Sequence, residues 1–335
     1  MLIENILKEK GIDGILLSKK ENILYSTGFF SEGALALVLP RCVILFVSHL
    51  DIKNAKNLDC ELEDIREFFK IIEQFKIEKL GFESEDMSFA RHKRLSAQVR
   101  LISLPDIYKK IRIIKKDQEI AKIKKVSHLT DQLISKLIPM VKEGISELDL
   151  LNHAKKISID LNTQGFSFDP IIAFGSHSAC PHHAPSTKKL KKNTPIMIDI
   201  GLKKDEYLAD MTRSFFYGKP NEQWCNVYKK VLKAHAEAIK AVSSERMCSF
   251  VHQRAEMAMG EKLIHALGHG VGLEIHEYPL VSLGSEDVFQ KNQVFTIEPG
   301  IYRKNFGIRI ENTYVLQEKL ISLNRSPIDI SKMII

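Results

Sequence analysis

The sequence predicts an α+β fold in two domains, residues 1–111 and 112–335. The chain has 335 residues, and a prior of about 150 residues per domain gives two domains. Apolar residues make up 44% of the chain and charged residues 27%, which is ordinary globular composition. In the second part, helical patterns are followed by short strand-like segments separated by turns. This order favours helices packed on a mainly antiparallel sheet.

The first part has an α/β pattern. Residues 1–10 carry apolar side chains at helical spacing, and Gly11 follows as a C-cap. The most apolar stretch, residues 34–50, is split by Pro40 and Arg41 into two runs. Each run is too short to span a bilayer, which takes about 20 residues, so we expect a β-hairpin. The other expected elements are strands at 12–18 and 79–83 and a helix at 61–75.

The second part opens with a long helical pattern over residues 112–144, and Asp117 provides an acceptable helix start. A second helix is expected from Glu147 to about Asn162, with Ser146 as its N-cap. Strand-like segments follow from Phe166 onward. They are PIIAFG, PIMIDIG, YLADMTRSFFYG, QVFTIEPGIY and FGIRIENTYVL, with a helical pair expected at 222–242 and 249–267.

Composition disfavours several other classes of protein. The net charge is +7, with lysines clustered at 188–192. Since no aromatic residues interleave with them and no nucleic-acid motif is present, we interpret them as a solvated surface. The five cysteines are odd in number and form no CxxC pair, which favours a reducing compartment. The charged N-terminal segment argues against export. We therefore expect a cytoplasmic protein without nucleic-acid or membrane partners.

Four acidic residues lie where strands normally carry apolar side chains. Asp199 lies in the apolar run PIMIDIGL, and Asp210 follows eleven residues later, after a polar turn. A hairpin there would bring the two carboxylates side by side. Glu298 ends the strand-like segment VFTIE, and Glu311 lies in GIRIENTY.

An unpaired ionised carboxylate is costly in an apolar setting, and four together would repel one another. Arg213 and Arg309 are the arginines nearest to these acids in the sequence, too few for four acids. Divalent metal explains the acids better than the alternative, in which they face solvent and form salt bridges. Carboxylates with an imidazole suit Mn²⁺, Co²⁺, Fe²⁺ or Zn²⁺. Shared carboxylates can bridge two such ions about 3.5–4 Å apart.

Histidines form two local clusters. In PHHAPS, flanking prolines stiffen the loop that holds His182 and His183, and we interpret His183 as a structural residue. In HALGHGVGLEIHE, His265 and His269 have the spacing of the zinc-protease motif HExxH, but residue 266 is Ala266 and the general base is missing. The glycines around His269 indicate close approach of the backbone, so we interpret His269 as a metal ligand.

Five motifs together closely resemble the pita-bread metallopeptidases, a family that includes prolidase, aminopeptidase P and methionine aminopeptidase. They are PHHAPS, MIDIG with ADMTR, LGHGVGLEIHE, TIEPG and GIRIENT, in the family's order across residues 181–313. The segment IDGILLSKKENILYSTGF (12–29) is similar to the creatinase/prolidase N-terminal domain, which methionine aminopeptidase lacks. HEYP, with Pro279, is closer to prolidase than to aminopeptidase P. The resemblance implies a creatinase-like α/β domain followed by a pita-bread catalytic domain with a curved, mainly antiparallel sheet.

The resemblance also implies a site for two divalent ions, with Mn²⁺ preferred over Co²⁺, Zn²⁺ and Fe²⁺. Asp199 would bind one metal and Asp210 both. His269 and Glu298 would complete the shell of the other metal, and Glu311 would bridge the pair.

Further roles follow from the same resemblance. His182 and His276 match histidines that hold the substrate carbonyl and the tetrahedral oxyanion, and His265 and Arg309 match positions near the substrate. Glu298 is expected to move a proton to the leaving nitrogen.

The resemblance implies a homodimeric metallo-exopeptidase. It would hydrolyse Xaa-Pro bonds of dipeptides with water activated by the two metals. The alternatives are an aminopeptidase P acting on longer Xaa-Pro-Yaa peptides and, from a different class, a metal-free binding protein on the same fold.

Overall fold

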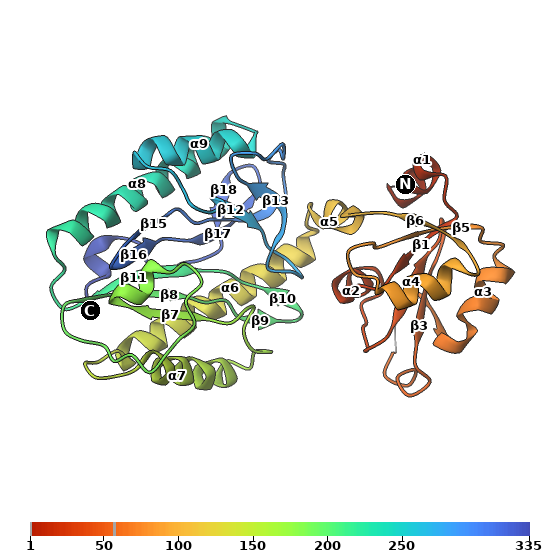
Figure 1. Ribbon diagram of the computed structural model, residues 1–335, viewed down its shortest axis with the longest axis horizontal. Coiled ribbons are helices and arrows are strands. Elements are labelled where there is room, and N and C mark those ends of the chain that lie inside the picture. The colour runs from red at the N-terminus through yellow and green to blue at the C-terminus, as the bar shows by residue number, and fades with distance from the viewer. Residues whose placement is uncertain (1, 56–57) are drawn as a thin grey trace. The chain divides into compact units, whose positions relative to one another are not determined.

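The computed structural model describes residues 2–55 and 58–335. The chain forms two compact units, Met1–Ile111 and Arg112–Ile335, and each is described by itself (Figure 1). Within the described part of the chain, every helix is too short or too polar to span a bilayer.

The first unit is a mixed sheet with the strand order β4-β3-β2-β1-β5-β6. Its strands are β1 (Gly14–Leu17), β2 (Leu35–Val38), β3 (Val43–Val47), β4 (Glu61–Asp64), β5 (Lys79–Phe82) and β6 (Arg100–Ser103). Its helices are α1 (Leu2–Lys10), α2 (Lys20–Thr27), η1 (Ile65–Glu67), α3 (Phe68–Gln74), α4 (Phe89–Ser96) and α5 (Ile107–Arg112).

Apolar side chains on both faces of this sheet are buried, so helices must cover both. One core contains Phe68 of α3 and Leu95 of α4, and the other contains Leu7 of α1 and Ile23 of α2. The hairpin expected at 34–50 is confirmed as the antiparallel pair β2 and β3.

The prediction of a helix at 61–75 is wrong for its first turn. Residues Glu61–Asp64 instead form β4, which pairs in parallel with β3. Asp64 then accepts the backbone N–H of Arg66 at 2.9 Å, so helical structure begins only after this cap. Pairing with a distant strand overrides the local helical pattern here.

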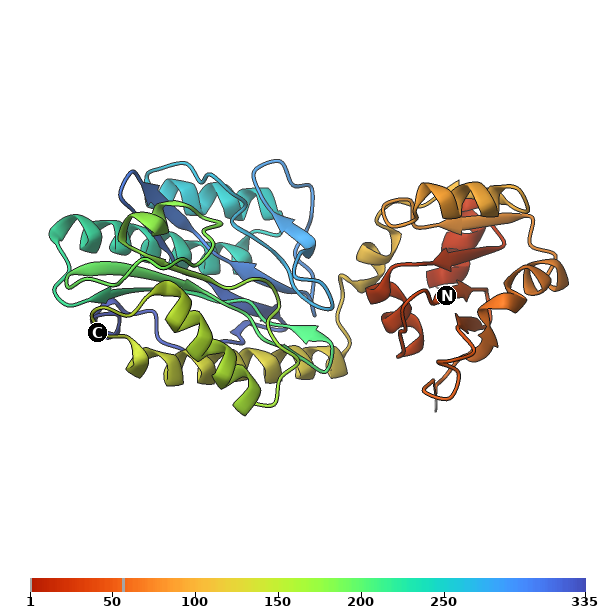
Figure 2. The same cartoon turned by 60° about the horizontal axis from the view of Figure 1, so that its bottom comes forward.

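The second unit places helices on both sides of antiparallel strands, as Figures 1 and 2 show: α8 and α9 lie on one side, and α6 and α7 on the other. The helices are α6 (Asp117–Leu137), η2 (Ile138–Met140), α7 (Glu147–Asp160), η3 (Gly175–Ala179), α8 (Glu222–Ser244), α9 (Cys248–Met259) and η4 (Ile330–Lys332).

Two expected helices of this unit are shorter in the structure than predicted. The helix expected over 112–144 is α6 alone, because Pro139 lacks the N–H that a continuing helix needs and lies in η2. The helix expected over 249–267 ends at Met259, where Gly260 takes a left-handed conformation with φ of 74°. By contrast, Ser146 caps α7 as expected, since its hydroxyl accepts the N–H of Asp149 at 3.1 Å.

The strands of the second unit form small sheets with orders β11-β8-β7, β13-β12-β14-β17-β18, β10-β9 and β15-β16. Every strand pair within them is antiparallel. The strands are β7 (Ile171–Phe174), β8 (Thr194–Asp199), β9 (Lys203–Lys204), β10 (Tyr207–Leu208), β11 (Thr212–Tyr217), β12 (Gly268–Gly270), β13 (Glu277–Val281), β14 (Val294–Ile297), β15 (Gly300–Arg303), β16 (Phe306–Arg309), β17 (Asn312–Leu316) and β18 (Leu320–Ser322).

Two of the expected long strands are each broken in the middle. QVFTIEPGIY divides into β14 and β15, with Glu298 and Pro299 between them, and FGIRIENTYVL divides into β16 and β17, with Ile310 and Glu311 between them. The halves pair in different sheets, because β14 pairs with β17 and β15 pairs with β16. Glu298 and Glu311 therefore both lie at crossings from one sheet to another.

A histidine, His235 on α8, lies among the buried residues of the second unit. Its side chain is fully buried, and Nε2 lies 3.3 Å from the hydroxyl of Tyr314. Nδ1 has no hydrogen-bond partner among the described residues. Burial, with a smaller contribution from the charge of Arg213, lowers the pKa of His235 to about 3 from the ordinary 6.5.

We predict that His235 makes the protein less stable in mild acid. Its folded pKa lies below its unfolded pKa, so the unfolded chain takes up the proton first as the pH falls, and stability decreases below about pH 6.5. One such group removes about 2 kcal/mol of the free energy of unfolding between pH 7 and pH 5. Denaturant unfolding followed by the fluorescence of the single tryptophan, Trp224, should show that His235→Gln loses this part of the pH dependence. An unchanged pH dependence would contradict the prediction.

Candidate metal centre

The five predicted metal ligands lie at strand ends and strand breaks of the second unit. Asp199 is the last residue of β8, Asp210 lies between β10 and β11, and His269 is the middle residue of β12. Glu298 and Glu311 occupy the two breaks described above. The register of β8 and β11 places Asp199 opposite Thr212, two residues after Asp210, so the hairpin brings the two aspartates close as expected.

The ligand atoms of Asp210, His269 and Glu311 lie within 4.8 Å of one another. His269 Nε2 is 3.6 Å from Asp210 Oδ2 and 3.2 Å from Glu298 Oε1. Asp210, His269 and Glu311 are buried, with exposed fractions of 5%, 8% and 1%. The Glu298 side chain is 15% exposed.

Glycines allow this close approach. A Cβ at Gly268 would lie 2.0 Å from the carbonyl oxygen of Thr296, and one at Gly270 would lie 2.1 Å from that of Tyr278. Neither position can accept a side chain, because both contacts are with backbone. The close backbone approach predicted around His269 is therefore present.

Burial and mutual repulsion make the acids hard to ionise together. Burial, then the charge of Asp199, raises the pKa of Asp210 well above its usual range. Burial, then the charge of Asp210, does the same to Glu311. Burial also raises the pKa of Asp199, although the charge of Arg309 opposes the shift. Without a bound metal, these surroundings therefore favour protonated carboxyls.

Within this group of ligands, His269 forms its shorter ion pair with Glu298 and a longer one with Asp210. Burial alone would lower the pKa of His269, but its hydrogen bond to Glu298 and the nearby charges raise it to about 9. Burial alone would raise the pKa of Glu298, but the hydrogen bond and charge of His269 lower it to about 2. In the absence of a metal, a proton on His269 thus takes the place of a cation.

The donor set fits a divalent metal. Asp199 Oδ1 is buried and has no hydrogen-bond partner among the described residues, which is the state of an atom that awaits a ligand. His269 Nδ1 lies 3.1 Å from the carbonyl oxygen of Gly270. Because a carbonyl only accepts, Nδ1 carries a proton, and loss of the second proton from Nε2 would leave a lone pair there for a metal.

A second group of residues supports the acids. Thr212 donates its hydroxyl to Glu311 Oε2 at 2.7 Å and accepts Nε–H of Arg309 at 3.0 Å. Arg309 also donates to Asp199 and to the hydroxyl of Tyr302. Arg309 was predicted near the substrate, and the structure places it against Asp199, 4% exposed.

The remaining predicted residues differ in their surroundings. His182 and His276 are exposed, and the ring of His276 lies 4.4 Å from that of His269. Partial burial of the His276 ring, then the charge of His269, lowers the pKa of His276. His265 Nε2 lies 3.1 Å from the hydroxyl of Tyr302, so His265 reaches Arg309 only through that tyrosine.

Sequence reasoning missed Tyr302 and Thr212. Tyr302 follows the TIEPG motif by two residues, and Thr212 lies inside the ADMTR motif. Their positions in these motifs were the available signal. Nothing in the composition distinguishes either residue from an ordinary strand residue.

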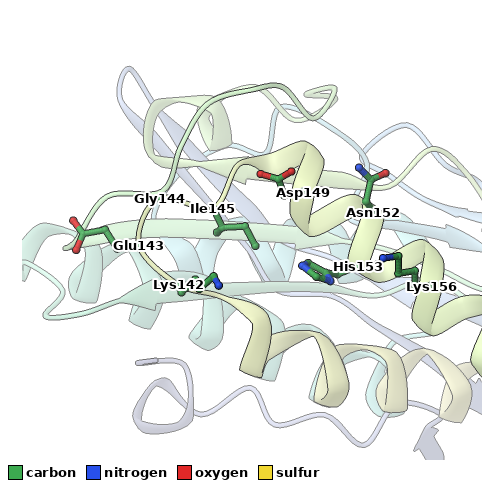
Figure 3. Close-up of a pocket in the computed structure, with 8 residues that line it drawn as sticks. All are labelled: Lys142, Glu143, Gly144, Ile145, Asp149, Asn152, His153 and Lys156. Atoms are coloured by element: carbon green, nitrogen blue, oxygen red, sulfur yellow. The ribbon is translucent and has the colours of Figure 1, made fainter.

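A separate group of metal-binding residue types lies in the same unit. Glu147, His177 and His183 also offer ligand atoms within 4.8 Å of one another. His183 lies 2.9 Å from Glu147, which agrees with its interpretation as a structural residue. An open surface pocket of about 510 Å³ lies beside the start of α7 (Figure 3), and its lining contains none of the predicted site residues.

Comparison with family models gives two matches that together span most of the chain. Residues 121–318 match the model of metallopeptidase family M24, and residues 2–114 match the creatinase/prolidase N-terminal domain. A protein of Staphylococcus aureus (strain bovine RF122 / ET3-1) named as an uncharacterized peptidase is 32% identical over 91% of this chain and 92% of its own length.

Solved structures match the chain over nearly its whole length. A structure described as Xaa-Pro dipeptidase from Bacillus anthracis has a TM-score of 0.93 at 25% identity, covering 99% of this chain and 98% of its own. Prolidase from Pyrococcus furiosus has a TM-score of 0.88 at 30% identity, and the match covers 96% of this chain and 99% of that structure's chain. X-Pro aminopeptidase from Thermotoga maritima MSB8 has a TM-score of 0.89 at 28% identity, and the match covers 98% of this chain and 99% of that structure's chain. The expected fold, a creatinase-like domain followed by a pita-bread domain, is thereby confirmed.

We predict that Glu311 destabilises the metal-free protein at high pH. Its folded pKa lies above the ordinary 4.5, so the stability that its proton provides is lost as the pH rises through the folded pKa. Glu311→Gln cannot ionise and still accepts from Thr212. In chelator at pH 8, it should melt at least about 2 °C above wild type, the shift that about 1 kcal/mol gives in a unit of this size.

The exposed Glu286 provides a control, since Glu286→Gln should melt like wild type. Adding Mn²⁺ should stabilise wild type more than Glu311→Gln. A Glu311→Gln protein that is less stable than wild type in chelator would count against the proposed electrostatics.

Proposed function

This chain belongs to metallopeptidase family M24, and on that premise we propose that it is an exopeptidase that hydrolyses Xaa-Pro bonds, preferentially in dipeptides. The observation that carries the proposal is the convergence of the buried side chains of Asp210, His269 and Glu311, on a chain that matches both domains of prolidase-like enzymes. Solved structures similar to it over nearly the whole chain carry the names Xaa-Pro dipeptidase and prolidase.

We propose that Asp199, Asp210, His269, Glu298 and Glu311 hold two divalent ions, with Mn²⁺ preferred over Co²⁺, Zn²⁺ and Fe²⁺. Support comes from the orphaned Asp199 Oδ1 and from the raised pKa values of Asp210 and Glu311. Oxygen donors with one imidazole suit these ions. When bound, the ions would polarise the scissile carbonyl and lower the pKa of water.

The side chains themselves divide the remaining work. His276 has a lowered pKa, so at pH 7 it is neutral and offers an N–H to the oxygen that gains charge in the transition state. His182 is exposed and lies near enough for its charge to act on His276, so it is suited to the same task. Glu298 is the least buried of the acids and is ionised beside His269. It can therefore accept a proton and pass it to the leaving nitrogen.

Proline at the second position gives the enzyme a specific task. The Xaa-Pro bond is a tertiary amide whose nitrogen carries no hydrogen, and it populates the cis isomer far more than other peptide bonds. Recognition by N–H donation from the scissile amide is therefore impossible. The preference for dipeptides is supported by the Xaa-Pro dipeptidase match. The X-Pro aminopeptidase match keeps longer peptides as the alternative.

We also propose that the protein is a cytoplasmic homodimer. All five cysteines are free thiols, as expected in a reducing compartment. The family resemblance supports the dimer.

A substrate panel tests the proposed function. With Mn²⁺ present, an Xaa-Pro dipeptide should be cleaved with kcat/KM at least about tenfold above that of the corresponding Xaa-Ala dipeptide, a difference of about 1.4 kcal/mol. The same first residue in an Xaa-Pro-Yaa tripeptide should be a poorer substrate. Asp210→Ala should lose metal and at least about 10³-fold of activity. Asp205→Ala, an exposed aspartate on the same hairpin, should retain both.

Preference for the tripeptide would assign the protein to the aminopeptidase P type. Full activity of Asp210→Ala after dialysis against chelator would refute the metal centre. Absence of metal and of all peptide hydrolysis in wild type would favour a binding protein on the same fold.

A further inference from the structure

We propose that Glu147, in the first turn of α7, is a positioning residue that fixes the loop carrying His182; this rests on the proposed function, in which His182 serves the transition state. The loop runs from the end of β7 through η3 to Ser186. Glu147 lies outside the metal centre and takes no part in the roles assigned above.

Glu147 receives hydrogen bonds from both ends of the loop. At its start, the backbone N–H of Phe174 donates to Oε1 at 2.8 Å, and Nδ1 of His177 lies 2.9 Å from Oε1. At its end, Ser186 donates its backbone N–H and its hydroxyl to Oε2, at 2.9 Å and 2.7 Å. Nε2 of His183 lies 2.9 Å from the same oxygen. A single carboxylate therefore ties together residues that are far apart along the loop.

Burial and charge make this anchor rigid. The Glu147 side chain has no exposed surface. Burial alone would raise its pKa, but the hydrogen bonds from His183, Ser186, Phe174 and His177 outweigh burial and lower it. The group is thus an ionised, fully surrounded acceptor, and hydrogen bonds to an ionised acceptor are stronger than neutral ones. Removing its charge would leave several buried donors without their partner.

The anchor acts on His182 through its neighbour. Among the described residues, no hydrogen bond involves the His182 side chain, so its position depends on the backbone. The next residue, His183, is held by Glu147, and its ring lies 4.3 Å from that of His177. A further fixed point is Ser178, whose hydroxyl accepts the N–H of Gly307 at 2.9 Å. Between these points, Pro181 restricts the backbone just before His182.

The alternative use of this cluster is a further metal site, since Glu147, His177 and His183 offer suitable atoms. The hydrogen bonds favour the anchor. Distances of 2.9–3.1 Å from the ring nitrogens to the carboxylate are those of direct hydrogen bonds. The other donors to the carboxylate, the amides of Phe174 and Ser186 and the hydroxyl of Ser186, complete its acceptor capacity.

Glu147→Gln tests the proposal, because the amide keeps the shape but turns an NH₂ group toward donors. Asp149→Asn is the matched control. Asp149 lies in the same helical turn and caps it through Ser146, but it contacts the surface pocket rather than the loop (Figure 3). We expect Glu147→Gln to lower kcat for an Xaa-Pro dipeptide at least about tenfold with KM nearly unchanged, the pattern of a lost transition-state interaction. Asp149→Asn should leave kcat and KM unchanged.

A double mutant separates positioning from general damage. If Glu147 acts through His182, then Glu147→Gln combined with His182→Ala should be no slower than His182→Ala alone. Additive losses of kcat would overturn the proposal. His183→Ala provides a milder second variant if Glu147→Gln does not fold, and it should lower kcat in the same non-additive way.

Two readouts do not depend on peptide hydrolysis. Backbone amides of residues 175–186 should exchange hydrogen faster in Glu147→Gln than in wild type, and at the wild-type rate in Asp149→Asn. Metal content after loading should be equal in wild type and Glu147→Gln. If hydrogen exchange in this loop is the same in Glu147→Gln as in wild type, or if Glu147→Gln binds one metal equivalent less, the proposal that Glu147 anchors the loop is wrong. Absence of Xaa-Pro hydrolysis in wild type would instead refute the proposed function and leave the exchange result to decide on the loop.

Discussion

Repulsion among buried carboxylates is the constraint on which the second unit depends. Asp199, Asp210 and Glu311 each have a raised pKa because burial and the neighbouring acids disfavour their charged forms. Arg309 neutralises part of this charge through Asp199, and a proton on His269 stabilises Glu298. Asp210 shares the His269 cation with Glu298, and Glu311 forms no ion pair with any described residue. In the proposed metal centre, a divalent ion would supply the missing charge, and the same residues that destabilise the metal-free site would become its ligands.

The fold is arranged to allow this crowding. A continuous strand would place alternate side chains on opposite faces and bind its backbone in a ladder. Here β14 and β15, and likewise β16 and β17, are interrupted at Glu298 and Glu311, where the chain crosses between sheets. Gly268 lets β12 lie against Thr296 without a side chain, which brings His269 between the acids. The strand breaks and the absence of a Cβ at Gly268 thus bring the ligand side chains together, and the hydrogen bond from Thr212 helps to hold Glu311 among them.

The sequence was informative where a residue contradicts its local setting. Acids inside apolar strands and a histidine among glycines predicted the residues that the structure brings together. It was uninformative where the cause is distant. Residues 61–64 form a strand because β3 pairs with them, and no local pattern shows this. Glu147 resembles any acid in the first turn of a helix, and its role appears only when Phe174, His183 and Ser186 meet it. Tyr302 joins Arg309 to His265 only in three dimensions.

Proton release on metal binding tests the central electrostatic claim most directly. Mn²⁺ would be titrated into the chelated, dialysed protein near pH 7 by calorimetry, in two buffers with different ionisation enthalpies. Binding should release protons to the buffer, because His269, with a pKa of about 9, holds one in the metal-free state, and the raised pKa values of Asp210 and Glu311 favour their protonated forms. Binding heats that do not depend on the buffer would show that the carboxylates are already ionised, and would contradict the account.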